Sequence, residues 1–282
     1  MSLSCPGMRL ARPDVFHPRI VLAGCPQHPA GDGDDAGLVA ALRQRGLHAR
    51  WLSWDNPDTC HADLVILRAP HDYPGRLEEF LAWTVGIKKL LNAANVVNWN
   101  LDRRYLHDLA ARGVPTVPGE IVAPDRRVRL PASGQVFIGP AVGTGTRLCA
   151  DRSAAVAYAA QLHDAGRSVL VQPAPGPETV LVFLGGKPSH AFPSEPDFEL
   201  WDVGAATLAA AAAETGIEVS ELLYARVHLS GSQLLELQLV DPSLDWRRLD
   251  AGARDLAQRK FALAVESACE RLGLGPFSHR RP

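Results

Sequence analysis

The N-terminal part of the chain alternates short, continuously apolar runs with segments of helical periodicity, and this alternation limits the folds available to it. Residues 19–25, RIVLAGC, have the unbroken apolar character of a buried strand, and further strands are predicted at 49–54 and 62–70. Residues 33–46 and 76–91 carry apolar side chains at helical spacing. Strands alternating with helices are typical of a parallel sheet covered by helices, so we predict a small three-layer α/β unit that binds ligands at the carboxyl ends of its strands.

The rest of the chain has a different order of elements, typical of an α+β arrangement. Hairpins are predicted at 178–192, with Gly185 and Gly186 in the turn, and at 222–240, with the turn at residues 230–232. Further helices are predicted at 100–113, 152–166, 203–214 and 253–273, and further extended segments at 114–122, 136–138 and 168–174. The predicted fold class is therefore α/β followed by α+β.

Charge and cysteine content argue against several classes of function. The formal net charge is −2, from 29 basic and 31 acidic residues, which gives no basis for binding nucleic acid or an anionic membrane. The five cysteines are scattered and form no C-x-x-C pair, which argues against a disulfide framework or a zinc knuckle. No signal-peptide core or membrane-spanning run is evident, so we expect a cytoplasmic protein.

A glycine-rich loop follows the predicted strand 136–138. Gly143 and Gly145 stand between small residues in QVFIGPAVGTGTR, residues 135–147. A strand followed by such a loop brings backbone N–H groups to phosphates in several nucleotide-binding folds. The segment does not match a P-loop, because the chain has no lysine between Lys89 and Lys187.

Polar side chains gather on one face of the second predicted hairpin. Period-two alternation places Glu236 and Gln238 on the same face, with His228 on the adjacent strand and Asp241 just beyond. Carboxylate and amide oxygens at strand ends suit Mg²⁺. The same pattern also fits a solvated strand face, and spacing alone leaves both interpretations open.

A second candidate site follows the strand at 62–70. Arg68, Asp72 and Tyr73 lie where α/β units expose residues that bind ligands. A surface turn built on Asp72 and Pro74 accounts for the same residues equally well.

Five segments of the chain occur in the order found in ATP-grasp proteins. They are ADLVILRAPHDYPGRLEEFLAW, VVNWNLDRRYLHDLAARGVPTVP, SVLVQPA, VFLGGKPSHAF and LLYARVHLSGSQLLELQLVDPSL. Over residues 19–272 the chain resembles this superfamily, in particular its glutathione-synthetase-like and cycloserine-ligase-like bacterial carboxylate–amine ligases. Residues 1–17 are expected to form a flexible leader, and the resemblance implies a pre-ATP-grasp α/β domain at 18–98 and an ATP-grasp domain at 99–282. Within the latter it implies a mobile lobe at about 120–195 and a C-terminal lobe at about 196–282 that clamp MgATP.

The resemblance also assigns roles to individual residues. It implies Arg226 as a catalytic residue, and Glu236, Gln238 and His228 as ligands of Mg²⁺ or Mn²⁺. It implies Arg68, Asp72 and Tyr73 as substrate-binding residues. For ATP it implies contacts from Arg103, Gly143, Gly145, Gln172 and Glu178.

Several positions depart from the family's pattern. Gly139 and Pro193 stand where the family has lysines, and Arg103 replaces a further lysine but keeps its charge. His228 and Gln238 replace an aspartate and a glutamate of the metal site. Neutral ligands and a lost cation both weaken the binding of a metal–phosphate complex.

Two functions are therefore predicted. The first is an ATP-grasp protein with a degraded MgATP site, which binds a ligand or a protein partner and has weak or no ligase activity. The alternative is an active ATP-dependent carboxylate–amine ligase that works through an acyl phosphate. A small-molecule carboxylate or amine is the expected substrate class, ATP with Mg²⁺ or Mn²⁺ the expected cofactors, and a homo-oligomer is compatible with either function.

Overall fold

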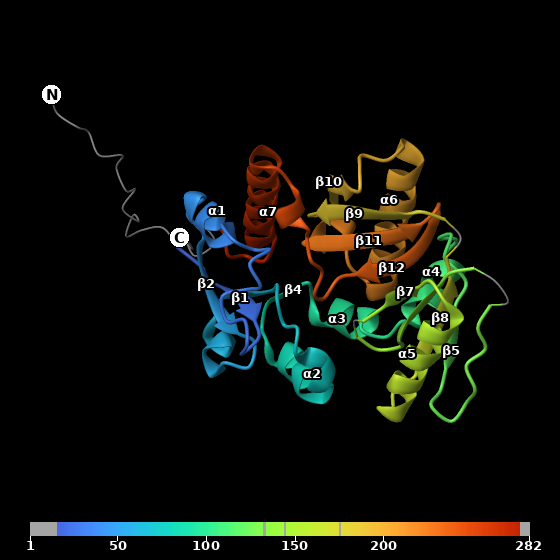
Figure 1. Ribbon diagram of the computed structural model, residues 1–282. Helices are drawn as coiled ribbons and strands as arrows, with labels where there is room; N and C mark the ends of the chain where they lie inside the picture. The colour runs from blue at the N-terminus through green and yellow to red at the C-terminus, as the bar shows by residue number, and fades with distance from the viewer. Residues whose placement is uncertain (1–15, 132–133, 144, 175, 277–282) are drawn as a thin grey trace.

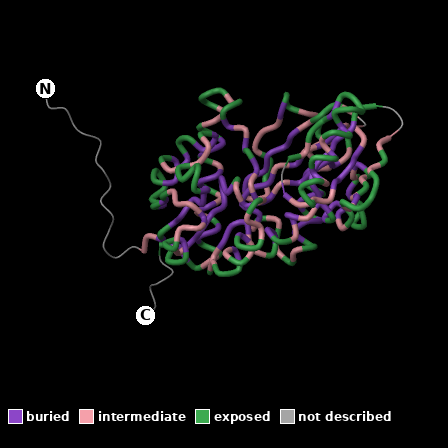
Figure 2. The backbone as a smooth tube through the Cα atoms, turned by 60° about the horizontal axis from the view of Figure 1, so that its bottom comes forward, coloured by how far each residue is buried: buried purple, intermediate pink, exposed green. Residues whose placement is uncertain are grey.

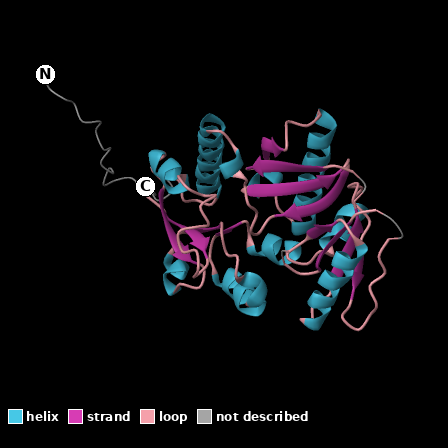
Figure 3. Cartoon of the chain, in the orientation of Figure 1, coloured by secondary structure: helices cyan, strands magenta, loops and turns pink. Residues whose placement is uncertain are grey.

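The structure is a computed structural model that describes residues 16–131, 134–143, 145–174 and 176–276 (Figure 1). Nearly all of the predicted leader at 1–17 lies outside these residues. Within the described chain the strands form three four-stranded sheets, each accompanied by helices (Figure 3). The helices are α1 Leu38–Gln44, α2 Leu77–Gly86, α3 Ala94–Asn100, α4 Tyr105–Ala111, α5 Arg152–Asp164, α6 Phe198–Thr215 and α7 Ala251–Arg271, with short 3₁₀ turns at Pro57–His61, Tyr73–Gly75, Val219–Glu221 and Trp246–Arg248.

The first sheet is parallel, as predicted, with the strand order β2-β1-β3-β4. Its strands are β1 Arg19–Gly24, β2 His48–Ser53, β3 Leu64–Leu67 and β4 Leu90–Leu91. Strands β1 and β3 are continuously apolar because helices cover both of their faces. Ile20 and Leu22 pack with α1 and α7 on one face, whereas Val21 and Ala23 pack with α2 and α3 on the other.

The other two sheets are antiparallel. One has the order β10-β9-β11-β12, built from β9 Glu178–Leu184, β10 Lys187–Phe192, β11 Tyr224–Ser230 and β12 Gln233–Gln238. The other has the order β5-β8-β6-β7, built from β5 Glu120–Val122, β6 Val136–Pro140, β7 Arg147–Cys149 and β8 Val169–Pro173. Helix α6 packs on the first of these sheets and α5 on the second.

Both predicted hairpins are confirmed. Gly185 and Gly186 join β9 to β10 with φ angles of 58° and 74°, a left-handed conformation that favours glycine. Gly231, at φ 59°, has the same role between β11 and β12.

Several predicted helix boundaries are wrong, and α6 begins five residues before the predicted 203–214. The helix predicted at 76–91 ends at Gly86, and residues 90–91 form β4 instead. Of the helix predicted at 100–113 only α4, Tyr105–Ala111, is formed, and α3 ends at Asn100. Between them Asp102 forms a β-bridge with Val142 and the N–H of Arg103 donates to the carbonyl of Ala141 at 2.8 Å. These are contacts with the glycine-rich segment some forty residues along the chain, which local periodicity does not reveal.

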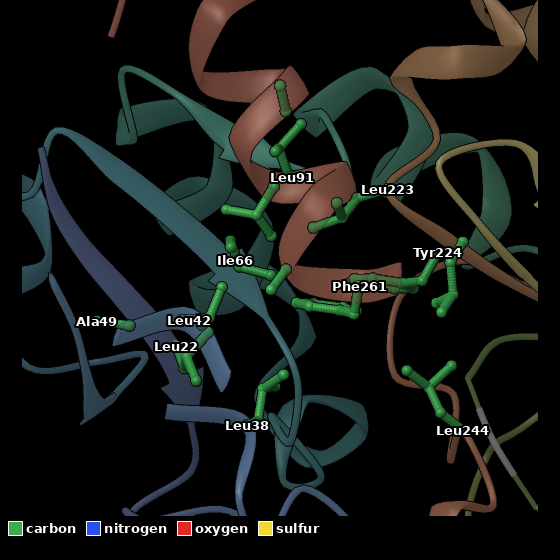
Figure 4. Close-up of a cluster of buried hydrophobic side chains, with 14 of the residues drawn as sticks. Leu22, Leu38, Leu42, Ala49, Ile66, Leu91, Leu223, Tyr224, Leu244 and Phe261 are labelled. Atoms are coloured by element: carbon green, nitrogen blue, oxygen red, sulfur yellow. The ribbon is translucent and has the colours of Figure 1, made fainter. Parts of the chain in front are cut away.

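The largest part of the core joins the two ends of the chain. Leu22, Leu38 and Ile66 from the first sheet and its helix share one apolar cluster with Tyr224 and Phe261 (Figure 4). Buried residues run through the interior of the molecule, and exposed residues form its outer turns and helix faces (Figure 2). In the described residues we find no helix with the length and apolar character needed to span a bilayer.

One buried amide connects the first sheet to the β9–β12 sheet. The side chain of Asn92, directly after β4, donates to the carbonyls of Tyr224 at 3.0 Å and Leu239 at 2.8 Å. Its Oδ1 accepts from the N–H of Leu223 at 2.8 Å. The residue is completely buried, so all three hydrogen bonds form away from solvent.

We predict that Asn92→Ala lowers the free energy of unfolding by about 3 kcal/mol, since a hydrogen bond contributes about 1 kcal/mol on average. Urea denaturation followed by circular dichroism measures the change. Asn98→Ala, at an exposed position of α3, is the matched control and should change stability by less than about 0.5 kcal/mol. Equal effects in the two variants would contradict the bridging role of Asn92.

Candidate functional site

A polar cavity of about 200 Å³ lies between the two antiparallel sheets. Phe137, Gly145, Thr146 and Leu148 line it from the β6–β7 side, and Glu178, Arg226, His228, Glu236 and Gln238 line it from the other sheet. The cavity therefore brings together the predicted catalytic arginine, the predicted metal ligands and two of the residues predicted to contact ATP.

Strand register explains why these side chains meet. In the β11–β12 pair, His228 lies opposite Glu236 and Arg226 lies opposite Gln238. Arg226 donates to Oε1 of Gln238 at 3.2 Å and pairs with Asp245 at 3.3 Å. The alternation of residues along the strands thus predicts this polar face correctly.

His228 interacts with a carboxylate rather than with the other predicted metal ligands. Its Nε2 lies 2.8 Å from Oε2 of Glu178. Burial lowers the pKa of His228 in spite of the neighbouring carboxylates of Glu236 and Glu178. The imidazole is therefore neutral near pH 7, and the contact with Glu178 is a hydrogen bond to a neutral ring.

Arg103 and Glu236 form a buried ion pair at the floor of the site. The guanidinium lies 2.6 Å from Oε1 of Glu236, and the side chains are only 3% and 7% exposed. The same guanidinium donates to Oγ1 of Thr146 at 2.8 Å. Its second terminal nitrogen, Nη1, has no hydrogen-bond partner in the described chain, so Arg103 retains a free donor.

A second, smaller cavity adjoins the first. Its lining includes Tyr73, Arg103, Gly143 and Asp241, and it shares Glu236 and Gln238 with the first cavity. The two cavities therefore join at Glu236 and Gln238. Residues predicted to bind phosphate, metal and substrate all lie around this junction.

The glycine-rich loop lies against this site, and the Gly143 N–H and the Gly145 carbonyl are bonded within the protein. Gly143, at φ 84°, donates its N–H to the carbonyl of Leu101 at 3.1 Å. The carbonyl of Gly145 accepts from the hydroxyl of Tyr158 at 2.6 Å. A bond from the Gly143 N–H to a phosphate, as predicted, therefore requires this part of the loop to move.

Gly139 has a packing role that its sequence position did not reveal. A Cβ atom at this position would lie 2.7 Å from Oγ1 and 2.9 Å from Cα of Thr146. Thr146 therefore occupies the space that a longer side chain would need. Pro193, the other position where a lysine was expected, is exposed beyond β10 and lies outside the lining of both cavities.

Two predicted site residues serve other contacts. Asp72 accepts from Nε1 of Trp54 at 2.7 Å and from Arg76 at 3.1 Å, and it borders neither cavity. Gln172 is completely buried and its Nε2 donates to the carbonyls of Val117 and Leu235 at 3.2 and 3.4 Å, so its side chain joins neighbouring segments instead of lining the site.

Arg68 borders a third cavity, at the carboxyl ends of β1 and β3. It is paired with Asp35 at 2.9 Å, donates to the carbonyl of Pro242 and lies over the ring of Tyr224. His71 and Asp241 line the same cavity. The interaction with Asp241 raises the pKa of His71, and burial raises the pKa of Asp241.

The residues present suit a magnesium ion that completes its coordination with phosphate and water. They do not form a metal site from protein ligands alone. In the part of the chain that the structure describes, no group of three His, Cys, Asp or Glu side chains could hold a metal. Mg²⁺ commonly binds one or two carboxylates and completes its shell with phosphate oxygens and water. Glu236 and Gln238 supply one carboxylate and one amide oxygen, whereas the imidazole of His228 is a poor ligand for this ion.

Thr146 is one of the site residues that sequence reasoning missed. It contacts Arg103 and limits the space at Gly139. A hydroxyl side chain within the glycine-rich segment is the sequence feature that could have identified Thr146 as a site residue.

Comparison with known proteins places this geometry in a family context. Residues 20–95 match the family model described as the N-terminal domain of D-cycloserine synthetase DcsG. The cycloserine biosynthesis protein DcsG of Streptomyces lavendulae is 29% identical over 277 residues, covering 80% of this chain and 92% of that protein. The crystal structure of D-cycloserine synthetase DcsG superposes with a TM-score of 0.73 at 28% identity, covering 90% of this chain and 99% of that one.

The chain has the ATP-grasp fold and is similar to DcsG. D-alanine–D-alanine ligase from Bacillus anthracis, solved with ATP, shares the fold with a TM-score of 0.64 at 14% identity, over 91% of this chain and 98% of that one. The ATP-grasp fold predicted from five short segments is confirmed. The predicted degradation of the MgATP site receives no support from these relatives.

We predict that Arg103→Met lowers the free energy of unfolding by about 3–5 kcal/mol, because Glu236 would remain charged and buried without its partner. The double variant Arg103→Met/Glu236→Gln should recover part of this loss, since it removes the unpaired charge. Urea denaturation of the two variants and the parent measures both effects. A double variant less stable than Arg103→Met would show that the pair is not the source of the loss.

We predict that Gly139→Ala lowers the free energy of unfolding by about 1–3 kcal/mol, the usual cost of overpacking. In the background Thr146→Gly the same substitution should cost less, because Oγ1 and Cβ of Thr146 are removed and only the contact with its Cα remains. Thermal denaturation of the four proteins gives the coupling between the two positions. Additive effects would rule out contact with Thr146 as the cause.

Proposed function

We propose that this chain is an ATP-dependent ligase that joins a carboxylate to an amine through an acyl phosphate. This is the alternative of the two predicted functions. The observation that supports it is the convergence of Arg103, Glu236 and Gln238 where the two cavities meet, on a fold whose homologues bind ATP and magnesium.

The Arg103–Glu236 pair is suited to a binding role. A buried ion pair contributes little net stability compared with apolar residues of similar size, so its presence favours a function for the charges. Arg103 carries a fixed positive charge and a free donor, which suit a phosphate oxygen. Glu236 with Gln238 would hold Mg²⁺, which would neutralise phosphate charge during transfer.

Arg226 has a role in the proposed reaction. Arg226 adds a second positive charge at the cavity wall, where it would stabilise the negative charge of an acyl phosphate. In this reaction the substrate carboxylate takes the terminal phosphoryl group of ATP and ADP leaves. The amine then attacks the acyl carbon, loses a proton and displaces phosphate.

Two of the departures from the family pattern have local explanations that do not require loss of function. Gly139 is required by its packing against Thr146. His228 forms a hydrogen bond with Glu178. The cavity of about 200 Å³ is smaller than the roughly 300–1,000 Å³ typical of ligand pockets, so a nucleotide would need more room than this cavity alone provides.

We predict that millimolar MgATP raises the melting temperature of the protein by several degrees. A ligand at 100 times its Kd contributes about 2.7 kcal/mol, and each kcal/mol corresponds to about 2–4 °C for a chain of this size. Glu236→Gln should abolish most of the shift. Glu214→Gln on α6, which alters an ion pair with Arg112 at the end of α4, should leave the shift in melting temperature unchanged.

The absence of any shift with either MgATP or MnATP would refute the ligase proposal. A second measurement tests turnover directly: hydroxylamine converts an acyl phosphate to a hydroxamate, so a carboxylate substrate should give hydroxamate together with ADP.

A further inference from the structure

A fourth cavity, of about 430 Å³, lies at the amino ends of the strands of the first sheet. Arg19 begins β1, Asp63 directly precedes β3, and Lys88 and Lys89 directly precede β4. These three strands are adjacent and parallel, so their amino ends meet at one edge. The third cavity lies at the opposite, carboxyl edge of the same strands, and the length of the strands separates the two.

One wall of the fourth cavity is apolar and is fixed by the main core. Phe16, Ala62 and Leu274 line it. Leu274, just beyond the end of α7, is buried in the cluster that contains Leu22 and Phe261, and Phe16 packs against the same cluster. The volume of the cavity lies within the roughly 300–1,000 Å³ typical of ligand pockets. The wall therefore offers apolar surface to a molecule of moderate size.

Two of the charged residues that line the cavity neutralise each other. Asp63 accepts from the backbone N–H of Arg19 at 2.8 Å, and its carboxylate pairs with the guanidinium of Arg19 at 3.2 Å. In spite of partial burial, these hydrogen bonds and the charges of Arg19 and Lys89 lower the pKa of Asp63. Asp63 is therefore ionised near pH 7 and balances the charge of Arg19.

The two lysines leave positive charge without a counterion. Lys89 donates from Nζ to the carbonyl of Leu272, at the end of α7, at 2.5 Å. A lysine ammonium has three donors, so this neutral carbonyl uses one of them and balances no charge. Lys88 is exposed, and within the described chain it has neither an ion pair nor a side-chain hydrogen bond. The cavity thus combines an apolar wall with two cations that can accept an acidic group.

The ends of the chain are poor occupants of this cavity. Phe16 and Leu274 line it close to the limits of the described residues. The segments beyond, 1–15 and 277–282, contain Arg9, Arg12, Arg280 and Arg281 against one acidic residue, Asp14. Their net charge has the same sign as the charge of the lysines. Charge complementarity therefore favours an anion from outside the chain.

We propose that the fourth cavity binds a small organic anion, with its acidic group on Lys88 and Lys89 and its apolar body against Phe16, Ala62 and Leu274. A ligand at this edge of the sheet is separate from the substrates of the proposed reaction. The proposal does not rest on the ligase function, because none of these residues has a role in it.

The test uses the full chain and 8-anilinonaphthalene-1-sulfonate, an aromatic anion whose fluorescence rises in apolar surroundings. We expect saturable binding of one molecule per chain in the folded protein. N-phenyl-1-naphthylamine has the same aromatic body without the sulfonate and should bind much more weakly. Saturating MgATP should not displace the sulfonate, since the two molecules occupy different cavities.

Cys60 reports where the anion binds. Its thiol is exposed and lines the fourth cavity, whereas Cys25, Cys149 and Cys269 are buried. The sulfonate should slow the reaction of Cys60 with N-ethylmaleimide severalfold, as measured by mass spectrometry of the peptide that contains this residue. Benzoate, a smaller aromatic anion, should compete with the sulfonate, and inorganic phosphate, which has no apolar body, should compete less well.

Lys88→Glu should weaken binding of the sulfonate about tenfold or more, the usual effect of losing a charge-assisted hydrogen bond. Lys88→Arg keeps the charge and should bind nearly as the parent does. Lys187→Glu makes the same change of charge at an exposed position of β10, so it is the matched control and should bind as the parent does. Lys88 is exposed, so all three variants are expected to fold.

Several outcomes would overturn the proposal. They are equal binding of N-phenyl-1-naphthylamine, an equal loss of affinity in Lys187→Glu and Lys88→Glu, or an unchanged rate of modification of Cys60. Displacement by MgATP would assign the sulfonate to the nucleotide cavity and would refute the proposal as well. The melting-temperature experiment with MgATP tests the ligase proposal separately, because a protein that fails it can still bind the sulfonate at Lys88.

Discussion

Helix α7 packs against the first sheet and the β9–β12 sheet at once, and the rest of the molecule depends on this packing. Phe261 and Val265 share one apolar cluster with Leu22 and Ile66 from the parallel sheet and with Val182 from the antiparallel one. The first sheet is parallel and must be covered on both faces, yet one of its covering helices comes from the end of the chain. The segments after β1, β3 and β12 are consequently held together, and the third cavity forms where they meet.

The parts of the fold that follow from local rules could be predicted from the sequence. Continuous apolar runs identified β1 and β3, paired glycines identified the β9–β10 turn, and alternation placed Glu236 and Gln238 on one face. The errors arose where a distant segment overrode local preference. The bridge between Asp102 and Val142 interrupts a periodic helix, and no pattern within 100–113 indicates it.

In the site, too, local patterns were predictable and contacts between distant segments were not. Alternation along the strands identified Glu236, Gln238 and His228 of the first cavity, whereas Arg226 and Glu178 were inferred from the family resemblance. Sequence reasoning could not show that Thr146 fills the space beside Gly139, or that Asp72 is bonded to Trp54 and Arg76, because these contacts depend on how separate segments pack. The glycine at position 139, where a lysine was expected, suggested a lost function. In this chain the packing of Thr146 also favours glycine at that position.

Asp241 belongs to two cavities, one with Arg103 and Glu236 and one with Arg68 and His71. A charge that enters either cavity changes the electrostatic potential at this single carboxylate, and thereby the affinity of the other cavity. Thermodynamic linkage makes such an effect reciprocal. Two ligands bound on either side of Asp241 would accordingly bind cooperatively or antagonistically without any change in the backbone, and the sign of the coupling would depend on the charges that each of them carries.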